Sequence, residues 1–150
     1  MIDLAVSITV AATPEDVARI MFTPARYPDW MHSVHRVEAA PGPAITGDRV
    51  TNHGAMMGQP LSWTMVVVVS GPQVLELNVV DGPFVGTVTY TVLPRDGGAH
   101  VQIHDVGRLE GPAAGLPVGQ VEAALRQSIA ADLGRLKALV ESEAAAARVG

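Results

Sequence analysis

The sequence predicts one α+β domain in which a curved, seven-stranded antiparallel sheet wraps around a long C-terminal helix. Strand-like segments follow one another almost without interruption, and short connections make consecutive strands antiparallel neighbours. Two short helices follow the first strand, and a long amphipathic helix closes the chain from about Gly119 to Glu143. A helix laid across a curved sheet can enclose a cavity. We therefore expect a hollow, ligand-holding domain over residues 1–150, with a frayed tail at 144–150.

Alternation and capping predict the first strand and the helices after it. Residues 2–10 alternate apolar and polar side chains, which is the period of a half-buried strand. Thr13 is a typical N-cap residue and Pro14 suits the first helical turn, so a helix is expected over residues 14–22. A second short helix is expected around Tyr27–Trp30.

Six further strands and one long loop complete the expected order. Glycine, proline and aspartate residues form the turns between the strands. The strands are expected at residues 34–40, 48–57, 60–70, 73–81, 85–94 and 99–110. The segment from Gly111 to Gly119 is rich in glycine and proline, and we expect a flexible connection that acts as a lid over one cavity end.

Composition excludes several classes of protein. The formal net charge of −5 argues against a nucleic-acid partner, because phosphate binding needs clustered Lys and Arg. The absence of cysteine excludes disulfides, thiolate metal sites and cysteine catalysis. The N-terminus lacks the pattern of a signal peptide, and the longest apolar run, Met65–Val69, is too short to span a bilayer. We expect a cytoplasmic domain, monomeric or homodimeric, that binds no nucleic acid and does not span a membrane.

Two hairpins predict which side chains point inward. Pairing Met57 with Pro60 places Gly54 opposite Trp63 and leaves Asn52 as the polar residue of an otherwise apolar face. The opposite face of these two strands is polar and is expected to be wet.

The hairpin around residues 96–98 predicts a second register. It places Tyr90 opposite Ile103, and Asp105 opposite Val88 on the inner face. A bulge would turn Asp105 outward.

The closing helix adds two polar residues to the same interior. At 100° per residue, Ser128 and Asp132 lie inside the apolar stripe, between Leu125 and Leu136. Burying a carboxylate is costly unless it gains a partner, a water molecule or a raised pKa. A cavity with a few converging polar groups is the usual form of a small-molecule site.

Two interior carboxylates are candidate acid–base groups. Apolar surroundings would raise the pKa of Asp105, so that it could act as general acid or base near neutral pH. The alternative is that a bulge or strand end exposes Asp105 to water. Asp132 is a second candidate, and its alternative is to cap a loop or to pair with Arg126 or Arg135.

Tyr90 and Asn52 complete the candidate catalytic set. Both can donate a hydrogen bond to a developing oxyanion and hold a carbonyl group. The alternative for both is ordinary core polarity that the backbone satisfies.

Large side chains and one serine are candidate ligand-binding residues on this interior. They are Trp30, Met56, Trp63, Met65, Leu77, Phe84 and Ser128. The tryptophans and methionines equally suit a packed core, and Trp30 could plug the end of the barrel near the short helices.

No cofactor and no metal site is expected. His32 and His35 lie near a helix end, while His100 and His104 share an outward, wet strand face. A metal site needs three or four converging ligands with support behind them.

Short motifs along the whole chain resemble a known superfamily. They are the segment Val6–Val17, Tyr27-Pro28, Ser62-Trp63, Gly82-Pro83-Phe84 and Gly97-Gly98. With the order of strands and helices, they resemble the START-like, helix-grip superfamily that includes Bet v 1 allergens and polyketide cyclases. The similarity is closest to single-domain polyketide aromatase/cyclases. It implies a helix-grip fold with a ligand cavity over the whole chain.

Three positions depart from the aromatase/cyclase pattern. Val67 stands where those cyclases carry an interior arginine, and Val34 where they carry a tyrosine. Ser128 lies near their interior asparagine. The resemblance thus implies the cavity rather than the catalytic set.

The leading functional hypothesis is a cyclase or dehydratase-like enzyme acting on a polyketide or similar oxygenated hydrophobic molecule. The alternatives are a non-catalytic carrier or sensor of a lipid-like ligand, and an interaction module that uses the same fold without a cavity.

Overall fold

Seven antiparallel strands form one sheet in the order β1-β7-β6-β5-β4-β3-β2. The computed structural model describes residues 1–56 and 58–149. The strands are β1 (Ile2–Val10), β2 (Val34–Glu38), β3 (Arg49–Met56), β4 (Gln59–Ser70), β5 (Val74–Asp81), β6 (Phe84–Arg95) and β7 (Gly98–Leu109). Every strand predicted from the sequence is present, so the predicted fold class is confirmed.

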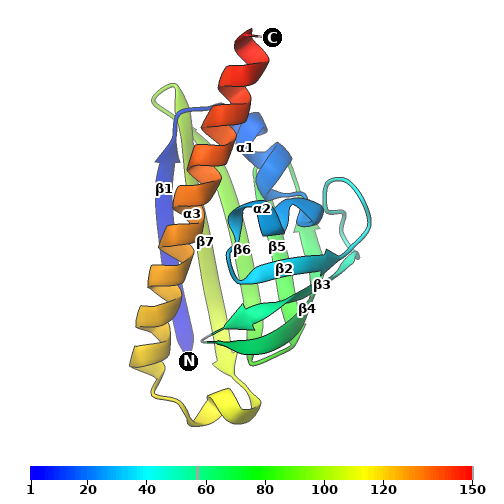
Figure 1. The fold of residues 1–150 in the computed structure, drawn as a ribbon, viewed down its shortest axis with the longest axis vertical. Coiled ribbons are helices and arrows are strands. Elements are labelled where there is room, and N and C mark those ends of the chain that lie inside the picture. The colour runs from blue at the N-terminus through cyan, green and yellow to red at the C-terminus, as the bar shows by residue number, and fades with distance from the viewer. Residues whose placement is uncertain (57, 150) are drawn as a thin grey trace.

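The helices cover one face of this sheet. They are α1 (Pro14–Met21), the 3₁₀ turn η1 (Pro24–Arg26), α2 (Tyr27–Trp30), the 3₁₀ turn η2 (Gly111–Gly115) and α3 (Val118–Val149). The Thr13 hydroxyl caps α1 by accepting from the backbone N–H of Asp16 at 3.1 Å. In Figure 1, α3 lies along β1 and β7 while α1 and α2 cover the neighbouring part of the sheet.

The closing helix is longer than the sequence pattern predicted. It begins at Val118 and continues to Val149, where a frayed tail was expected from Ala144; Gly150 lies outside the described residues. Alanine has the highest helix propensity, and Ala144 is buried against the core, which together explain the extension. The last turns project beyond the sheet (Figure 1). The connection before α3, expected to be flexible, contains η2.

The predicted register between β6 and β7 is confirmed. Tyr90 pairs with Ile103 and Val88 with Asp105. Asp96 and Gly97 both have positive φ, at 48° and 80°, as a two-residue hairpin turn requires.

The predicted register between β3 and β4 is wrong by two residues. Asn52 pairs with Trp63, Gly54 with Leu61, and Met56 with Gln59. The expected partner of Pro60, Met57, lies outside the described residues. Because the side-chain period of a strand is two, this shift leaves Asn52 and Trp63 on the predicted inner face.

The core lies between the inner face of the sheet and the C-terminal half of α3. Leu133, Leu136 and Val140 of α3 are buried. Further toward the helix N-terminus, Leu125 and Ser128 are only half-buried. The interior is therefore closed at one end and more open at the other.

Two cations of α3 bind the outer edge of β1. Arg126 Nη1 donates to the backbone oxygen of Ala5 at 3.1 Å, and Lys137 Nζ donates to that of Thr9 at 3.0 Å. A carboxylate of the same helix, Glu141, accepts from the backbone N–H of Ala11 at 2.8 Å. These bonds fasten the helix along the first strand.

Candidate functional site

Asp105 lies on the inner face of β7 between two apolar neighbours. It pairs with Val88 of β6 on one side and with Leu4 of β1 on the other. Its Oδ1 atom is buried and has no hydrogen-bond partner among the described residues. The strand contains no bulge at this point, so the carboxyl group points where the sequence predicted.

These surroundings change the acidity of Asp105. Burial raises the pKa of its carboxyl group from 3.8 to about 7, although the nearby His104 opposes the shift. Near neutral pH, comparable populations of the acid and the carboxylate therefore coexist. A group in that condition can both take and give a proton.

Three aromatic rings pack edge to face beside this carboxyl group. The ring centroids are 5.9 Å apart for Tyr27 and Trp30, 6.4 Å for Tyr27 and Tyr90, and 6.2 Å for Trp30 and Tyr90. Trp30 is 1% exposed. It thus plugs the end of the interior near the short helices, which was one of the two positions open to it.

Tyr27 belongs to this cluster although it was not a predicted site residue. It is fully buried, and its hydroxyl group has no hydrogen-bond partner among the described residues. Its position in the Tyr27-Pro28 motif, directly before the helical turn that carries Trp30, is the signal that could have identified it.

The Tyr90 hydroxyl group stays protonated at physiological pH. Burial raises its pKa well above 10, and the charges of Tyr27 and Asp105 add to the rise. Tyr90 pairs with Ile103, two positions from Asp105 on β7, so Tyr90 and Asp105 lie diagonally across β6 and β7 on the same face. The structure therefore brings a protonated donor and a carboxyl group of mixed protonation together on β6 and β7.

Asn52 faces the same interior from the far side of the sheet. It is 1% exposed, lies opposite Trp63, and has an Oδ1 atom without a partner among the described residues. Three strands separate β3 from β7, so Asn52 lies across the concave face from Asp105 rather than beside it.

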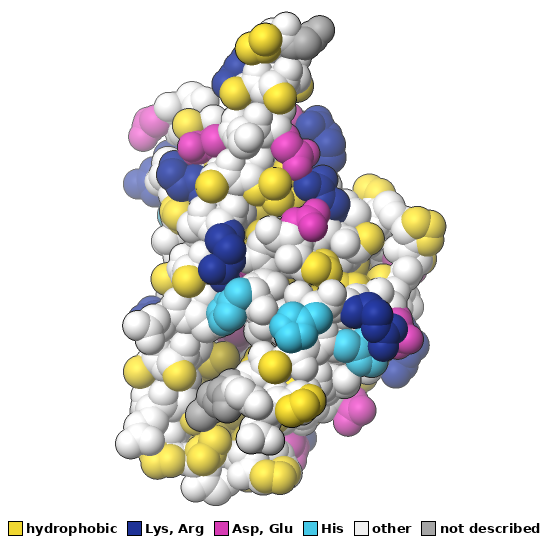
Figure 2. All heavy atoms as spheres, viewed as in Figure 1, with side chains coloured by type: hydrophobic (Ala, Val, Ile, Leu, Met, Phe, Trp, Pro, Cys, Tyr) yellow, Lys and Arg dark blue, Asp and Glu magenta, His cyan; other side chains and the backbone are white. Residues whose placement is uncertain are grey.

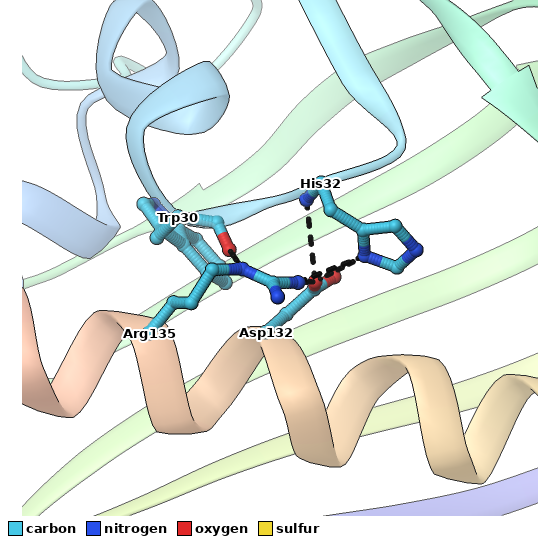
Figure 3. A network of polar contacts seen from close by, with 4 residues as sticks. All are labelled: Trp30, His32, Asp132 and Arg135. Carbon is cyan, nitrogen blue, oxygen red and sulfur yellow. Dashed lines mark hydrogen bonds and ion pairs between the residues drawn. The ribbon is translucent and has the colours of Figure 1, made fainter.

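Asp132 is buried, and one of its carboxylate oxygens has several polar partners (Figure 3). Its Oδ1 atom accepts from the backbone N–H of His32 at 3.3 Å and from Arg135 Nη2. His32 Nδ1 lies 2.8 Å from the same oxygen. Arg135 Nε also donates to the backbone oxygen of Trp30 at 3.1 Å.

This network holds the segment after α2 against α3. His32 Nδ1 lies 2.8 Å from both Asp132 Oδ1 and Arg135 Nη2, and it can donate to the first or accept from the second but not both. The pairing with Arg135 is the alternative left open for Asp132. Its geometry gives Asp132 a tethering position, in contrast to the unpartnered Asp105.

The predicted ligand-binding residues separate into two groups. Trp30, Met65 and Leu77 are almost fully buried and fill the core. The half-buried residues lie toward the open end, and they are Met56, Trp63, Phe84 and Ser128.

A pair of glycines lies at this open end. Gly86 and Gly107 are opposite each other on the inner face of β6 and β7, between Phe84 and the Val88–Asp105 pair. Neither contributes a side chain, and the space beside Gly107 is filled by the paired strand and by the Phe84 ring, which would lie 2.7 Å from a Cβ atom there.

The described residues leave hollows at two places, and the second of these includes Gly86. One of about 270 Å³ lies beside Lys137 and the turn at Asp96–Gly98, and one of about 420 Å³ lies beside residues 78–80 and 85–87. Neither is lined by a predicted site residue. The interior beneath α3 is occupied by side chains at its closed end.

No group of three metal-binding side chains occurs within the described part of the chain. Figure 2 shows histidine side chains on the face that carries the helices. None of the helices over residues 1–56 and 58–149 is long and apolar enough to cross a membrane.

The sequence matches one known family. Residues 1–141 match the model of a family described as polyketide cyclase / dehydrase and lipid transport. No protein of curated function matches the sequence significantly.

Solved structures share the fold at low sequence identity. The protein TTHA0849 from Thermus thermophilus is 18% identical with a TM-score of 0.81, over 95% of this chain and 99% of that one. The ZhuI aromatase/cyclase from Streptomyces sp. R1128 is 18% identical with a TM-score of 0.73, over 93% of each chain. A START superfamily protein from Mycobacterium smegmatis is 15% identical with a TM-score of 0.79, over 93% of this chain and 97% of that one. At these identities the likeness shows the fold alone.

Proposed function

Because the chain belongs to the polyketide cyclase/dehydrase and lipid transport family, we propose that it promotes cyclisation or dehydration of a hydrophobic, oxygen-bearing small molecule. The family confirms the resemblance to START-like proteins noted in the sequence. The proposed ligand lies at the open end of the interior, between the N-terminal half of α3 and the half-buried residues of the inner face.

The observation that supports catalysis is the buried carboxyl group of Asp105 with its raised pKa. Its Oδ1 atom has no hydrogen-bond partner among the described residues, and its carboxyl group has apolar neighbours and a pKa of about 7. A structural carboxylate would be expected to gain partners, as Asp132 does.

Asp105 supplies both proton transfers that a dehydration needs. The carboxylate removes a proton from the carbon next to a carbonyl group, which gives an enolate. The carboxylic acid so formed then protonates the β-hydroxyl group, which leaves as water while the carbon–carbon double bond forms. Such acid–base assistance contributes about 10²–10⁴-fold in rate.

Tyr90 has a supporting role in this scheme. Its protonated hydroxyl group donates to the oxygen that becomes negatively charged in the enolate. Asn52, across the concave face, would hold a second oxygen of an extended ligand through its amide.

The test is conversion of a linear β-polyketone thioester, followed by liquid chromatography and mass spectrometry. Asp105→Asn is expected to lower the rate by about 10²–10⁴-fold without weakening ligand binding. Glu76→Gln serves as the matched control. Glu76 accepts a hydrogen bond from the Thr89 hydroxyl group on the outer face of the sheet. Full activity of Asp105→Asn would refute the acid–base assignment.

A carrier of a lipid-like ligand is the second candidate, and two buried valines favour it. Val34 and Val67 stand where aromatase/cyclases carry a tyrosine and an arginine, and both are 2% exposed or less. An apolar interior without these groups suits binding without turnover. Native mass spectrometry with fatty acids would then show retained ligand, and Asp105→Asn would bind as tightly as the native chain.

A further inference from the structure

We propose that Glu38, His53 and Ser62 form a nucleophilic site on the outer face of the sheet that accepts the acyl group of an activated ester. The three residues come from the adjacent strands β2, β3 and β4. Their side chains project from the face opposite the interior, so this site is independent of the function proposed above.

The strand register brings these three side chains together on one face, with Glu38, the partner of Thr51, lying diagonally from His53. His53 and Ser62 are direct partners across β3 and β4, and His53 Nδ1 lies 2.8 Å from Ser62 Oγ. On the other side of the ring, His53 Nε2 lies 3.0 Å from Glu38 Oε2. Direct cross-strand partners on one face are close enough for such contacts without any special loop.

When His53 is neutral, only one placement of its proton satisfies both hydrogen bonds of the ring. The Glu38 carboxylate can only accept, so the proton of the ring lies on Nε2. The lone pair on Nδ1 then accepts the hydroxyl proton of Ser62. The side-chain hydrogen bond from His53, followed by that from Arg36, lowers the pKa of Glu38, which keeps this carboxylate ionised.

The same logic operates in serine hydrolases, with the imidazole ring reversed. There the serine faces Nε2 and the carboxylate holds the Nδ1–H group. To activate the serine, the ring nitrogen that faces its hydroxyl group must have a free lone pair. A carboxylate must also hold the proton on the other ring nitrogen. Both conditions are met here, and Ser62 is exposed, so an acyl donor can approach its oxygen.

Charge stabilisation limits the class of acyl donor. Backbone N–H groups of paired strands are engaged in the ladder and do not point at Ser62. The guanidinium of Arg36 lies opposite His53 on β2 and donates to Glu38 at 3.3 Å, so it serves the carboxylate rather than an oxyanion formed at Ser62 on β4. Such a site suits esters with good leaving groups, such as aryl esters. Figure 2 shows histidine, basic and acidic side chains gathered on the side where β2 and β3 lie.

The proposed reaction is a transfer of the acyl group to Ser62. The Ser62 oxygen forms a bond to the carbonyl carbon while its proton moves to His53 Nδ1. The bond from this carbon to the aryloxy oxygen then breaks and phenolate leaves, while the proton on His53 passes to the phenolate or to water. Water that attacks the acyl-serine in the same way releases the carboxylic acid.

The test uses p-nitrophenyl acetate with the full chain. We expect a burst of p-nitrophenolate of about one equivalent per chain and an acetyl group on the peptide that contains Ser62. Ser62→Ala should remove both signals, and His53→Gln should slow the burst by about 10²-fold or more. Ser7→Ala removes an exposed serine of β1 instead and should leave the burst unchanged.

Glu38 acts through His53, so its test needs a separate readout. Glu38→Gln should slow the burst and also produce a mixture of His53 tautomers, visible in ¹⁵N NMR spectra of the imidazole. An equal burst in Ser62→Ala, or acetyl groups confined to Met1 and Lys137, would overturn the proposal. An unchanged tautomer in Glu38→Gln would overturn the role of the carboxylate.

Discussion

Gly86 and Gly107 face each other across β6 and β7 with no room for a side chain on either. A Cβ atom on Gly86 would lie 2.1 Å from the backbone oxygen of Val106, and one on Gly107 would lie 2.3 Å from that of Val85. Neither distance is physically possible without a backbone shift. The close approach of the two strands, and that of the Phe84 ring to Gly107, thus depend on these two glycines.

Gly107→Ala should therefore be severely destabilising. The new methyl group would collide with backbone and with the Phe84 ring, 2.7 Å away, so we expect a loss of about 3 kcal/mol or more in the free energy of unfolding. Gly134→Ala in α3 is the matched control, since nothing lies within 4 Å of its Cβ position. It should stabilise by about 0.5–1 kcal/mol. Urea unfolding measures both, and similar effects of the two changes would contradict this reasoning.

Asp105 should make the stability of the protein depend on pH. The folded chain holds the Asp105 proton more tightly than the unfolded chain, because its pKa is raised from 3.8 to about 7. Stability from this group is greatest below about pH 4 and is lost as the pH rises through about 7.

Asp105→Asn should remove this dependence. The variant is expected to exceed the native chain by about 4 kcal/mol at pH 8, with little difference at pH 4. Asp96→Asn, at an exposed turn, should keep the native profile. Thermal unfolding across this pH range gives the answer. A constant difference between native and Asp105→Asn would show that Asp105 does not titrate in the folded state near pH 7.

Asp132→Asn should weaken the attachment of the segment after α2. The change removes the charge that accepts from Arg135 and from the backbone of His32, so we expect a loss of about 2–3 kcal/mol in the free energy of unfolding. Glu110→Gln breaks an exposed pair with Arg108 and should cost less than about 1 kcal/mol. Equal losses in urea unfolding would argue against a tethering role for Asp132.

The fluorescence of Trp63 should change when a ligand binds, whereas that of Trp30 should not. Trp63 is half-buried at the open end, whereas Trp30 is 1% exposed within the aromatic cluster. Acrylamide should quench the native fluorescence mainly through Trp63, and Trp63→Phe should leave a poorly quenched emission. Bound 1-anilinonaphthalene-8-sulfonate should protect Trp63 from acrylamide. Unchanged quenching with the probe bound would place its site elsewhere.

Local turn chemistry explains which parts of the sheet could be predicted. Asp96 and Gly97 form a two-residue turn that permits one register, and this register placed Tyr90 and Asp105 correctly. The hairpin between β3 and β4 contains fewer such signals, and pairing Met56 with Gln59 moves the turn to Gly58, whose φ is 77°. A shift of two residues leaves every side chain on the same face, so the alternation of apolar and polar residues could not reveal it.

Partners that are distant in sequence explain what could not be predicted in the site. The two inward carboxylates look alike in the sequence, but Asp132 gains His32, one hundred positions away, whereas Asp105 Oδ1 has no partner in residues 1–56 and 58–149. The contribution of Tyr27 likewise depends on β6, which packs against its ring. Periodicity identifies the face of a residue, and only tertiary packing decides whether that residue is satisfied.

The bonds from Arg126 and Lys137 to β1 have a consequence for behaviour in solution. An edge strand is a template on which another chain can add a strand, and aggregation begins in this way. Here two cations of α3 already occupy the carbonyl groups of Ala5 and Thr9. A second molecule would have to displace a helix before it could extend the sheet at this edge. The helix that closes the interior thus also discourages fibrous association of the protein.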